Sequence, residues 1–242
     1  MELDHVVHYV QDLDKARSQY QELGFVTQEG GRHSYGTQNI VTRVHRGYIE
    51  PITIVDWDLL RERRPMSMFN KLHEVITGGG GAISFGLCVS NIEQVAEHLQ
   101  NEGIKFTLRE SSIQRHDGTK KSWKYIILEE GPSKWNPFII DYGVPWEERA
   151  LRYGTKDHWT ISRIVVETQA PEEHGRWVAR IVGSSATPIE GGVRVPIRNG
   201  DVDVVRGSAE RITRVLFKEY DTPVGHIQGL NYGVDSSGNK LK

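Results

Sequence analysis

The sequence predicts an α+β fold made of repeated βαβββ modules, with a curved mixed sheet, helices on its outer face and a concave cup. Two observations predict this fold: an ungapped internal repeat, and a helical stripe framed by strand-like runs in each copy. Residues 3–25 and 82–104 match when the second segment is shifted back by 79 positions. Two such units side by side share one concave surface, and ligands bind in concave surfaces.

Both copies carry start and stop signals for one helix. Asp12 or Asn91 stands where a side-chain oxygen can accept the free amides of a helix start. Apolar residues then recur at helical spacing, which predicts one buried stripe in each copy. Gly24 or Gly103 follows and suits the left-handed position after a helix. Three strand-like runs separated by turn residues complete each unit.

The spacing of these signals divides the chain into five parts. The segment GGGG at 78–81 lacks the strand-to-helix setting of a phosphate loop, so we interpret it as a tether. We expect the run ITRVLFKE, residues 212–219, to be the last strand of a third unit. The parts are a first βαβββ module at 1–62, a linker helix and glycine tether at 63–81, a second module at 82–150, a third at 155–220 and a loose C-terminal tail at 221–242.

Composition excludes several classes of protein. The chain has 242 residues, of which 37% are hydrophobic, so it can bury a sizeable core. Its formal charge of −2 lacks the basic excess of a nucleic-acid-binding surface. Cys88 is the single cysteine, so no internal disulfide can form, and no apolar run approaches the roughly 20 residues that span a bilayer. We expect a cytoplasmic protein that binds neither nucleic acid nor membrane.

The first unit places a histidine and a carboxylate on strands that can be neighbours. His5 lies in the first strand, where side chains alternate between faces, so His5 and His8 point to opposite sides. Glu50 lies in the last strand, on the same face as Tyr48, among apolar residues where a carboxylate needs a partner. If first and last strands pair, the imidazole and the carboxylate can meet. The plain alternative for His5 is a buried strand histidine that a neighbour satisfies.

Three segments carry a resemblance to the glyoxalase-like branch of the vicinal oxygen chelate superfamily. They are LDHVVHYVQDLDKA at 3–16, GGRHSYGTQN at 30–39 and GYIEPI at 47–52. The resemblance implies paired βαβββ modules around a divalent metal. The metal is held by a His or Gln from each first strand and a Glu from each last strand. On this chain His5 and Glu50 match the first pair.

The second module departs from that pattern. The repeat puts Ser84 opposite His5, and matching PFIIDYG to GYIEPI puts Asp141 opposite Glu50. The resemblance therefore implies a site for Fe, Mn, Zn or Mg with His5, Glu50 and Asp141 as ligands. Serine is a poor substitute for imidazole, and His33 is a candidate replacement. A metal-free cup, in which His5 and Glu50 bond to each other and hold a polar ligand, is the alternative.

The loop at 30–39 gathers polar and aromatic groups beside the expected cup. Its arginine offers a planar fork to a carboxylate or phosphate, and the alternative is an ordinary surface hairpin. The charge run RERR at 61–64 is typical of a solvated helix face. The predicted substrate-binding residues are Arg32, His33, Tyr35, Asn39 and Tyr48.

Two functions from different classes remain open. One is a metal-assisted enzyme of isomerase, lyase or dioxygenase type, which acts on a small oxygenated molecule with Glu50 and His5 as catalytic groups. The other is a protein of the same fold that binds or sequesters a small molecule without metal. Modules of this kind pair, so the odd third module predicts a homodimer.

Overall fold

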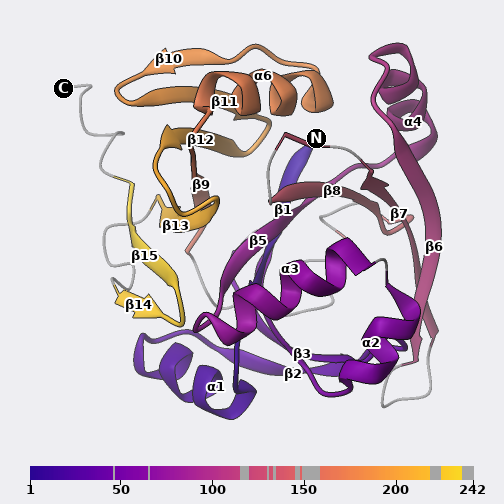
Figure 1. The fold of residues 1–242 in the computed structure, drawn as a ribbon, viewed down its shortest axis with the longest axis vertical. Coiled ribbons are helices and arrows are strands. Elements are labelled where there is room, and N and C mark those ends of the chain that lie inside the picture. Colours follow the sequence, from indigo (N-terminus) through magenta and orange to yellow (C-terminus); the bar gives the residue numbers. More distant parts are fainter. Residues whose placement is uncertain are drawn as a thin grey trace.

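The computed structural model describes residues 1–45, 47–64, 66–114, 120–129, 131–132, 135–144, 148, 159–218 and 225–235. All fifteen strands in this part of the chain belong to one curved, unclosed sheet, and five helices accompany it (Figure 1). The α+β class with repeated βαβββ modules is confirmed. Within the same ranges, no helix has the length and apolar character needed to cross a membrane.

The first module has its first and last strands side by side. Its elements are β1 (Glu2–Tyr9), α1 (Leu13–Glu22), β2 (Thr27–Arg32), β3 (Thr37–Arg43) and β4 (Tyr48–Ile54). β1 runs parallel to β4, so the strands that carry His5 and Glu50 are neighbours. The Asp12 side chain accepts the amides of Asp14 and Lys15, and Gly24 follows the helix with φ of 88°. The predicted start and stop of α1 are confirmed.

The second module repeats this order after two connecting helices. These are α2 (Trp57–Arg63) and α3 (Met66–Thr77), and α3 packs against β1. Asn91 caps the module's helix, and Gly103 follows it with φ of 67°, as predicted. The module consists of β5 (Gly81–Cys88), α4 (Ile92–Asn101), β6 (Phe106–Gln114), β7 (Lys120–Leu128) and β8 (Asn136–Asp141).

The two modules join where β1 pairs antiparallel with β5. The central pairs are His5 with Gly86, Val6 with Phe85, and Val7 with Ser84. The sequence repeat matches residue 5 with 84 and residue 7 with 86. Exchanging matched residues therefore turns the pair His5–Gly86 into the pair Ser84–Val7, which is also present. A local two-fold axis therefore passes between Val6 and Phe85, and the repeat found in the sequence is also a symmetry of the structure.

A third module follows, and it has a partner within the chain. It comprises β9 (Ile161–Thr168), α6 (Pro171–Val182), β10 (Thr187–Ile189), β11 (Gly192–Ile197) and β12 (Gly200–Arg206), with β12 parallel to β9. Three more strands form a shortened unit whose described residues include no helix: β13 (Arg211–Phe217), β14 (Gly225–Ile227) and β15 (Leu230–Val234). β13 pairs antiparallel with β9, as β5 does with β1, and parallel with β15.

This arrangement corrects two expectations. The run ITRVLFKE does not end the third module, since β13 takes the role of a first strand in the shortened unit. Residues 225–234 are not a loose tail, because β14 and β15 pair with each other and β15 extends the sheet. The polar composition of that segment concealed alternating buried residues at Ile227, Leu230 and Tyr232. The homodimer remains a prediction, but an unpaired third module no longer supports it, because that module pairs with the shortened unit of the same chain.

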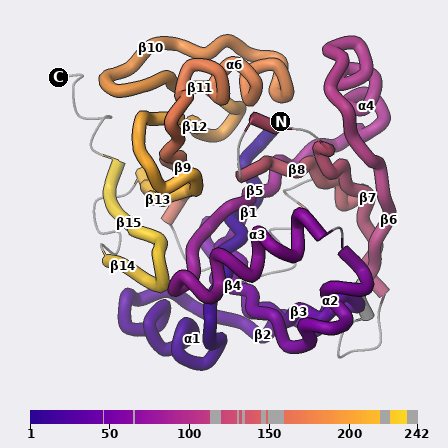
Figure 2. Tube along the Cα trace, in the orientation of Figure 1, coloured from indigo at the N-terminus to yellow at the C-terminus, as the bar shows by residue number. Residues whose placement is uncertain are grey.

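A buried chain of hydrogen bonds ties the C-terminal strands to the first module, and β14 lies beside α1 (Figure 2). His8 Nε2 lies 3.0 Å from the carbonyl oxygen of Gln228, which can only accept, so Nε2 carries the proton. His8 Nδ1 therefore accepts from the Tyr20 hydroxyl at 2.7 Å, and the Tyr232 hydroxyl donates to Tyr20 at 2.5 Å. This order keeps His8 neutral.

The neutral His8 predicts a loss of stability in mild acid. Burial is the main cause that lowers the pKa of His8 to about 4, whereas the unfolded chain takes up this proton below about pH 6.5. Between these values the unfolded state binds more protons, so stability falls as pH falls, by about 3 kcal/mol at pH 4. Urea unfolding at pH 7 and pH 4.5 measures this loss. His8→Gln should lose less stability on acidification than the wild type, while His45→Gln, at an exposed position, should behave as the wild type.

Candidate functional site

His5 is held at the centre of the first module with one ring nitrogen committed. His5 is only 2% exposed. Nδ1 lies 2.8 Å from Oδ2 of Asp4, and because a carboxylate accepts, Nδ1 carries the proton. Neighbouring strand residues normally face opposite sides, but a β-bulge between Leu3 and His5 shifts the register here. The free nitrogen, Nε2, lies 3.7 Å from Oε2 of Glu50.

Aromatic rings fix the plane of the imidazole. Tyr48 stacks on His5 with ring centroids 4.4 Å apart and an interplanar angle of 7°, and Phe138 meets it edge-on at 5.1 Å. The Tyr142 hydroxyl donates to Asp4 at 3.0 Å and accepts from the Tyr48 hydroxyl at 3.2 Å. Asp4 thus accepts from both His5 and Tyr142. Because these groups hold Asp4 from two sides, the tautomer of His5 is set by the surrounding structure.

Glu50 is oriented from its other side by the loop at 30–39. Asn39 Nδ2 donates to Oε1 of Glu50 at 2.5 Å, and Asn39 Oδ1 accepts from the amide of Gly31 at 2.7 Å. A Cβ atom on Gly30 would lie 2.1 Å from Asn39 Oδ1, so the glycine lets the amide approach the backbone. The Glu50 side chain keeps 14% exposure. Its Oε2 is therefore the oxygen left for a ligand and for His5.

The tip of this loop stacks beside the same carboxylate. His33 lies against Tyr35 with centroids 5.1 Å apart, and His33 Nδ1 bonds the Thr37 hydroxyl at 2.7 Å. Burial lowers the pKa of His33 and raises that of Tyr35, and the Glu50 charge raises both. Arg32 is exposed and lines a hollow on the hairpin that Asn39 also lines. The structure brings four predicted residues, Asn39, His33, Tyr35 and Tyr48, around Glu50 and His5 but leaves Arg32 at the rim.

Sequence reasoning missed Arg64. This residue ends the charge run at 61–64, which we interpreted as a solvated helix face. Its guanidinium carbon lies 3.9 Å from the centroid of the Tyr35 ring. Because α2 ends at Arg63, the backbone of Arg64 is already extended and its side chain leaves the helix face. The signal available in the sequence was Pro65, since a residue before proline disfavours the helical conformation.

The second module does not supply the matching ligands. In the first module Val7 pairs with Glu50 and in the second the equivalent Gly86 pairs with Phe138. Phe138, not Asp141, therefore stands opposite Glu50, and our alignment of PFIIDYG was wrong by three residues. Ser84 stands opposite His5 and donates its hydroxyl to the carbonyl oxygen of Asn136 at 3.0 Å.

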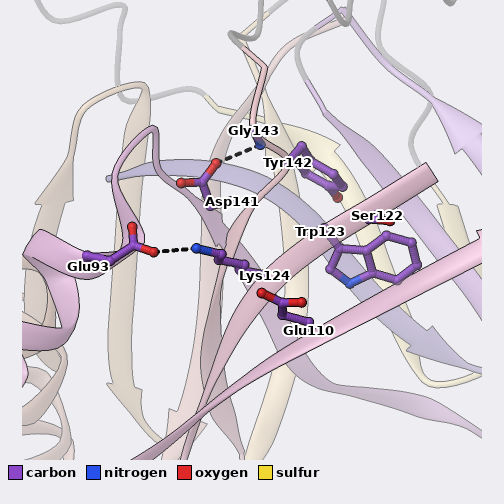
Figure 3. A pocket seen from close by; sticks show the side chains of 8 residues that line it. All are labelled: Glu93, Glu110, Ser122, Trp123, Lys124, Asp141, Tyr142 and Gly143. Atoms are coloured by element: carbon purple, nitrogen blue, oxygen red, sulfur yellow. Dashed lines mark hydrogen bonds and ion pairs between the residues drawn. The ribbon is translucent and has the colours of Figure 1, made fainter.

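Asp141 has a different role. Its Oδ2 accepts the amide of Ile92 at the start of α4 at 3.2 Å. Its Oδ1 accepts the amide of Gly143 at 2.8 Å, as Figure 3 shows. It lines a surface hollow together with the Glu93–Lys124 ion pair of 2.5 Å. Asp141 thus satisfies free backbone amides around the helix start and does not join His5 and Glu50.

The residues present do not fit the metal site that the resemblance implies. His5 and Glu50 supply two donors, and Ser84 and Phe138 occupy the positions of the other two. Phe138 has no donor atom, and its ring packs against His5. In the part of the chain that the structure describes, no three His, Cys, Asp or Glu side chains are grouped to hold an ion. Two donors fall short of the three protein ligands of a catalytic zinc site.

The third module shows the same positions occupied by an internal ion pair. Arg163 of β9 takes the place of His5, because it pairs with β12 and β13 as His5 pairs with β4 and β5. Asp203 takes the place of Glu50, because it pairs with Val165 as Glu50 pairs with Val7. Arg163 Nε lies 3.4 Å from Asp203, and its Nη2 lies 3.1 Å from Asp235. Arg194 binds both oxygens of Asp203, at 2.7 and 2.8 Å. Charged side chains of the chain itself fill this second location.

Comparison with known proteins yields one family and a set of similar folds. The family described as a glyoxalase-like domain matches residues 3–182. A hypothetical protein from Staphylococcus aureus has a TM-score of 0.81 at 16% identity, covering 96% of this chain and 97% of that chain. A mutant of 4-hydroxymandelate synthase from Streptomyces coelicolor has a TM-score of 0.59 at 11% identity, covering 89% and 70%. No curated protein matches the sequence. At these identities the two structures share the fold with this chain.

The close fit of His5 against β5 predicts that Gly86→Ala disrupts the site. The added Cβ would lie 2.6 Å from His5 Cε1 and 2.7 Å from Nδ1, so the ring must leave the position in which it bonds Asp4 and stacks on Tyr48. We expect a loss of about 1–3 kcal/mol in unfolding free energy, with a changed His5 signal in histidine NMR spectra. Gly233→Ala in β15 is the matched control, because its Cβ would make an ordinary 3.5 Å contact. An unchanged His5 signal in Gly86→Ala would contradict the described packing.

Proposed function

Since the chain belongs to the glyoxalase-like domain family of the vicinal oxygen chelate superfamily, we propose that it is an enzyme that transfers a proton on a small oxygenated molecule. One observation carries the proposal: Nε2 of His5, with its tautomer fixed by Asp4, faces Oε2 of Glu50 at 3.7 Å. That separation exceeds a direct hydrogen bond, so both atoms have capacity left for a ligand.

The chemistry follows from the two free atoms. Glu50 Oε2 is an acceptor that can take a proton from a carbon next to a carbonyl, while Asn39 keeps Oε1 in place. His5 Nε2 can take or return a proton on the neighbouring oxygen, and Asp4 stabilises the imidazolium that forms. Isomerase, epimerase and lyase reactions share this step. Dioxygenase chemistry needs a metal, for which the donor set is incomplete.

A metal-free binding protein is the second candidate. Ser84 bonds the backbone and Phe138 is apolar, so half of the cup has lost the polar groups that the superfamily places there. Such a cup can hold a ligand by stacking and by hydrogen bonds to Glu50 without transforming it. The two candidates differ in whether the protein transforms its ligand with Glu50 as the base or only binds it.

Hydrogen exchange in D₂O tests the enzyme proposal. Small 2-oxo acids, 2-hydroxy acids and ketoses are incubated with the protein, and loss of the α-proton is followed by ¹H NMR. We expect exchange of at least one compound to slow about 10²–10⁴-fold in Glu50→Gln and in His5→Gln. The exposed Glu62→Gln serves as the control. Wild-type exchange no faster than that of Glu50→Gln, for every compound, would favour the binding protein.

Removal of metal should leave the protein unaffected. With two donors in the cup, we expect less than about 0.2 equivalents of Fe, Mn, Zn or Mg after purification without chelator. Dialysis against EDTA should leave the exchange rate unchanged. It should also leave the thermal midpoint unchanged, because only a metal bound to the native state would have raised that midpoint before its removal. Stoichiometric metal lost in His5→Ala would overturn the metal-free mechanism.

A further inference from the structure

Arg64 presents a cation over Tyr35, in the turn between β2 and β3. Its backbone amide donates to the carbonyl oxygen of Leu60 at 3.0 Å, which anchors it at the end of α2. Its guanidinium lies over Tyr35 at 3.9 Å, and Tyr35 in turn stacks on His33 with an interplanar angle of 6°. Tyr35 thus contacts both the guanidinium at the end of α2 and the imidazole of His33. The stack restricts the guanidinium orientation before any ligand arrives.

One donor of this guanidinium, Nε, is buried without a hydrogen-bond partner among the described residues. Within the same part of the chain, none of the ion pairs involves Arg64. A buried cationic donor without a partner is costly, so its retention needs an explanation. Arg64 also acts electrostatically on Tyr9, His33 and Tyr35, the same residues that experience the Glu50 charge. Tyr35 lies in the turn before β3, and Asn39 of β3 holds Glu50, so Arg64 contacts the same hairpin that orients this carboxylate.

We propose that Arg64 binds a carboxylate of the substrate, so that the ligand of the cup is a small organic anion. This inference rests on the proposed function and names its substrate class. A guanidinium can offer two parallel N–H donors to the two oxygens of a carboxylate. An anionic group placed against Glu50 would be repelled, whereas at Arg64 it is neutralised. The uncharged oxygenated carbon of the same molecule then faces Glu50 and His5.

Titration calorimetry with paired probes tests the proposal. Pyruvate, lactate and mandelate are each compared with the neutral amide of the same acid, and inorganic phosphate serves as a further anion. We expect at least one carboxylate to bind more tightly than its amide to the wild type. Arg64→Gln should weaken that carboxylate about tenfold or more and remove the preference, whereas Arg64→Lys should retain part of it. Arg63→Gln, the exposed neighbour in the same run, should bind as the wild type.

Each outcome bears on the inference separately from the reaction. Glu50→Gln should retain carboxylate binding while its hydrogen exchange is lost, since it removes a base and a negative charge but not the fork. If Arg64→Gln binds carboxylates as the wild type does, or if no carboxylate is preferred over its amide, the anion site is wrong even where Glu50→Gln abolishes exchange. Preference for phosphate over every carboxylate would also overturn it. Thermal midpoints of Arg64→Gln and Arg63→Gln identify any loss of folding.

Discussion

The pairing of β1 with β5 is the constraint on which the rest of the structure depends. This ladder joins two modules about an axis between Val6 and Phe85, and it brings Gly86 against the ring of His5. The missing side chain at Gly86 provides the space in which His5 can face Glu50 while Phe138 closes the edge of the ring. A larger residue at position 86 would fill the space that the imidazole occupies. The geometry of the site is therefore a consequence of how two halves of the chain meet.

The first two modules have symmetric backbones but different side chains at the positions of His5 and Glu50. The two positions equivalent to His5 and Glu50 hold Ser84 and Phe138. Ser84 bonds a backbone carbonyl and Phe138 packs on His5, so neither provides a carboxylate or imidazole for a ligand. The remaining pair is asymmetric: Asp4 holds one end and Asn39 the other. Proton transfer needs only two such groups in contact with a ligand, whereas a catalytic zinc ion takes three protein ligands.

Most of the fold was predictable from the sequence because its signals are local. Caps at Asp12 and Asn91, helical spacing and closing glycines fix the modules without knowledge of distant contacts. The pairing of His5 with Glu50 followed from strand alternation and the family resemblance. Asp141 was misplaced because PFIIDYG and GYIEPI align by composition, while the register depends on hydrogen bonds across the sheet. Arg64 was missed because a charge run does not show which of its members leaves the helix.

The second pair of modules shows what separates a site from a structural contact. Arg163 and Asp203 hold the places of His5 and Glu50, at a similar separation of 3.4 Å against 3.7 Å. The difference lies in their surroundings: Arg194 takes both oxygens of Asp203, and Asp235 takes Arg163, so each charge is matched within the protein. Buried ionic networks of this kind are tolerated when every member has a partner. In the first module Arg64 stacks on Tyr35, and among the described residues no Arg or Lys forms an ion pair with Glu50. One fold thus contains a centre in which arginines pair with Asp203 and Asp235, and a centre at Glu50 where we propose that a ligand binds.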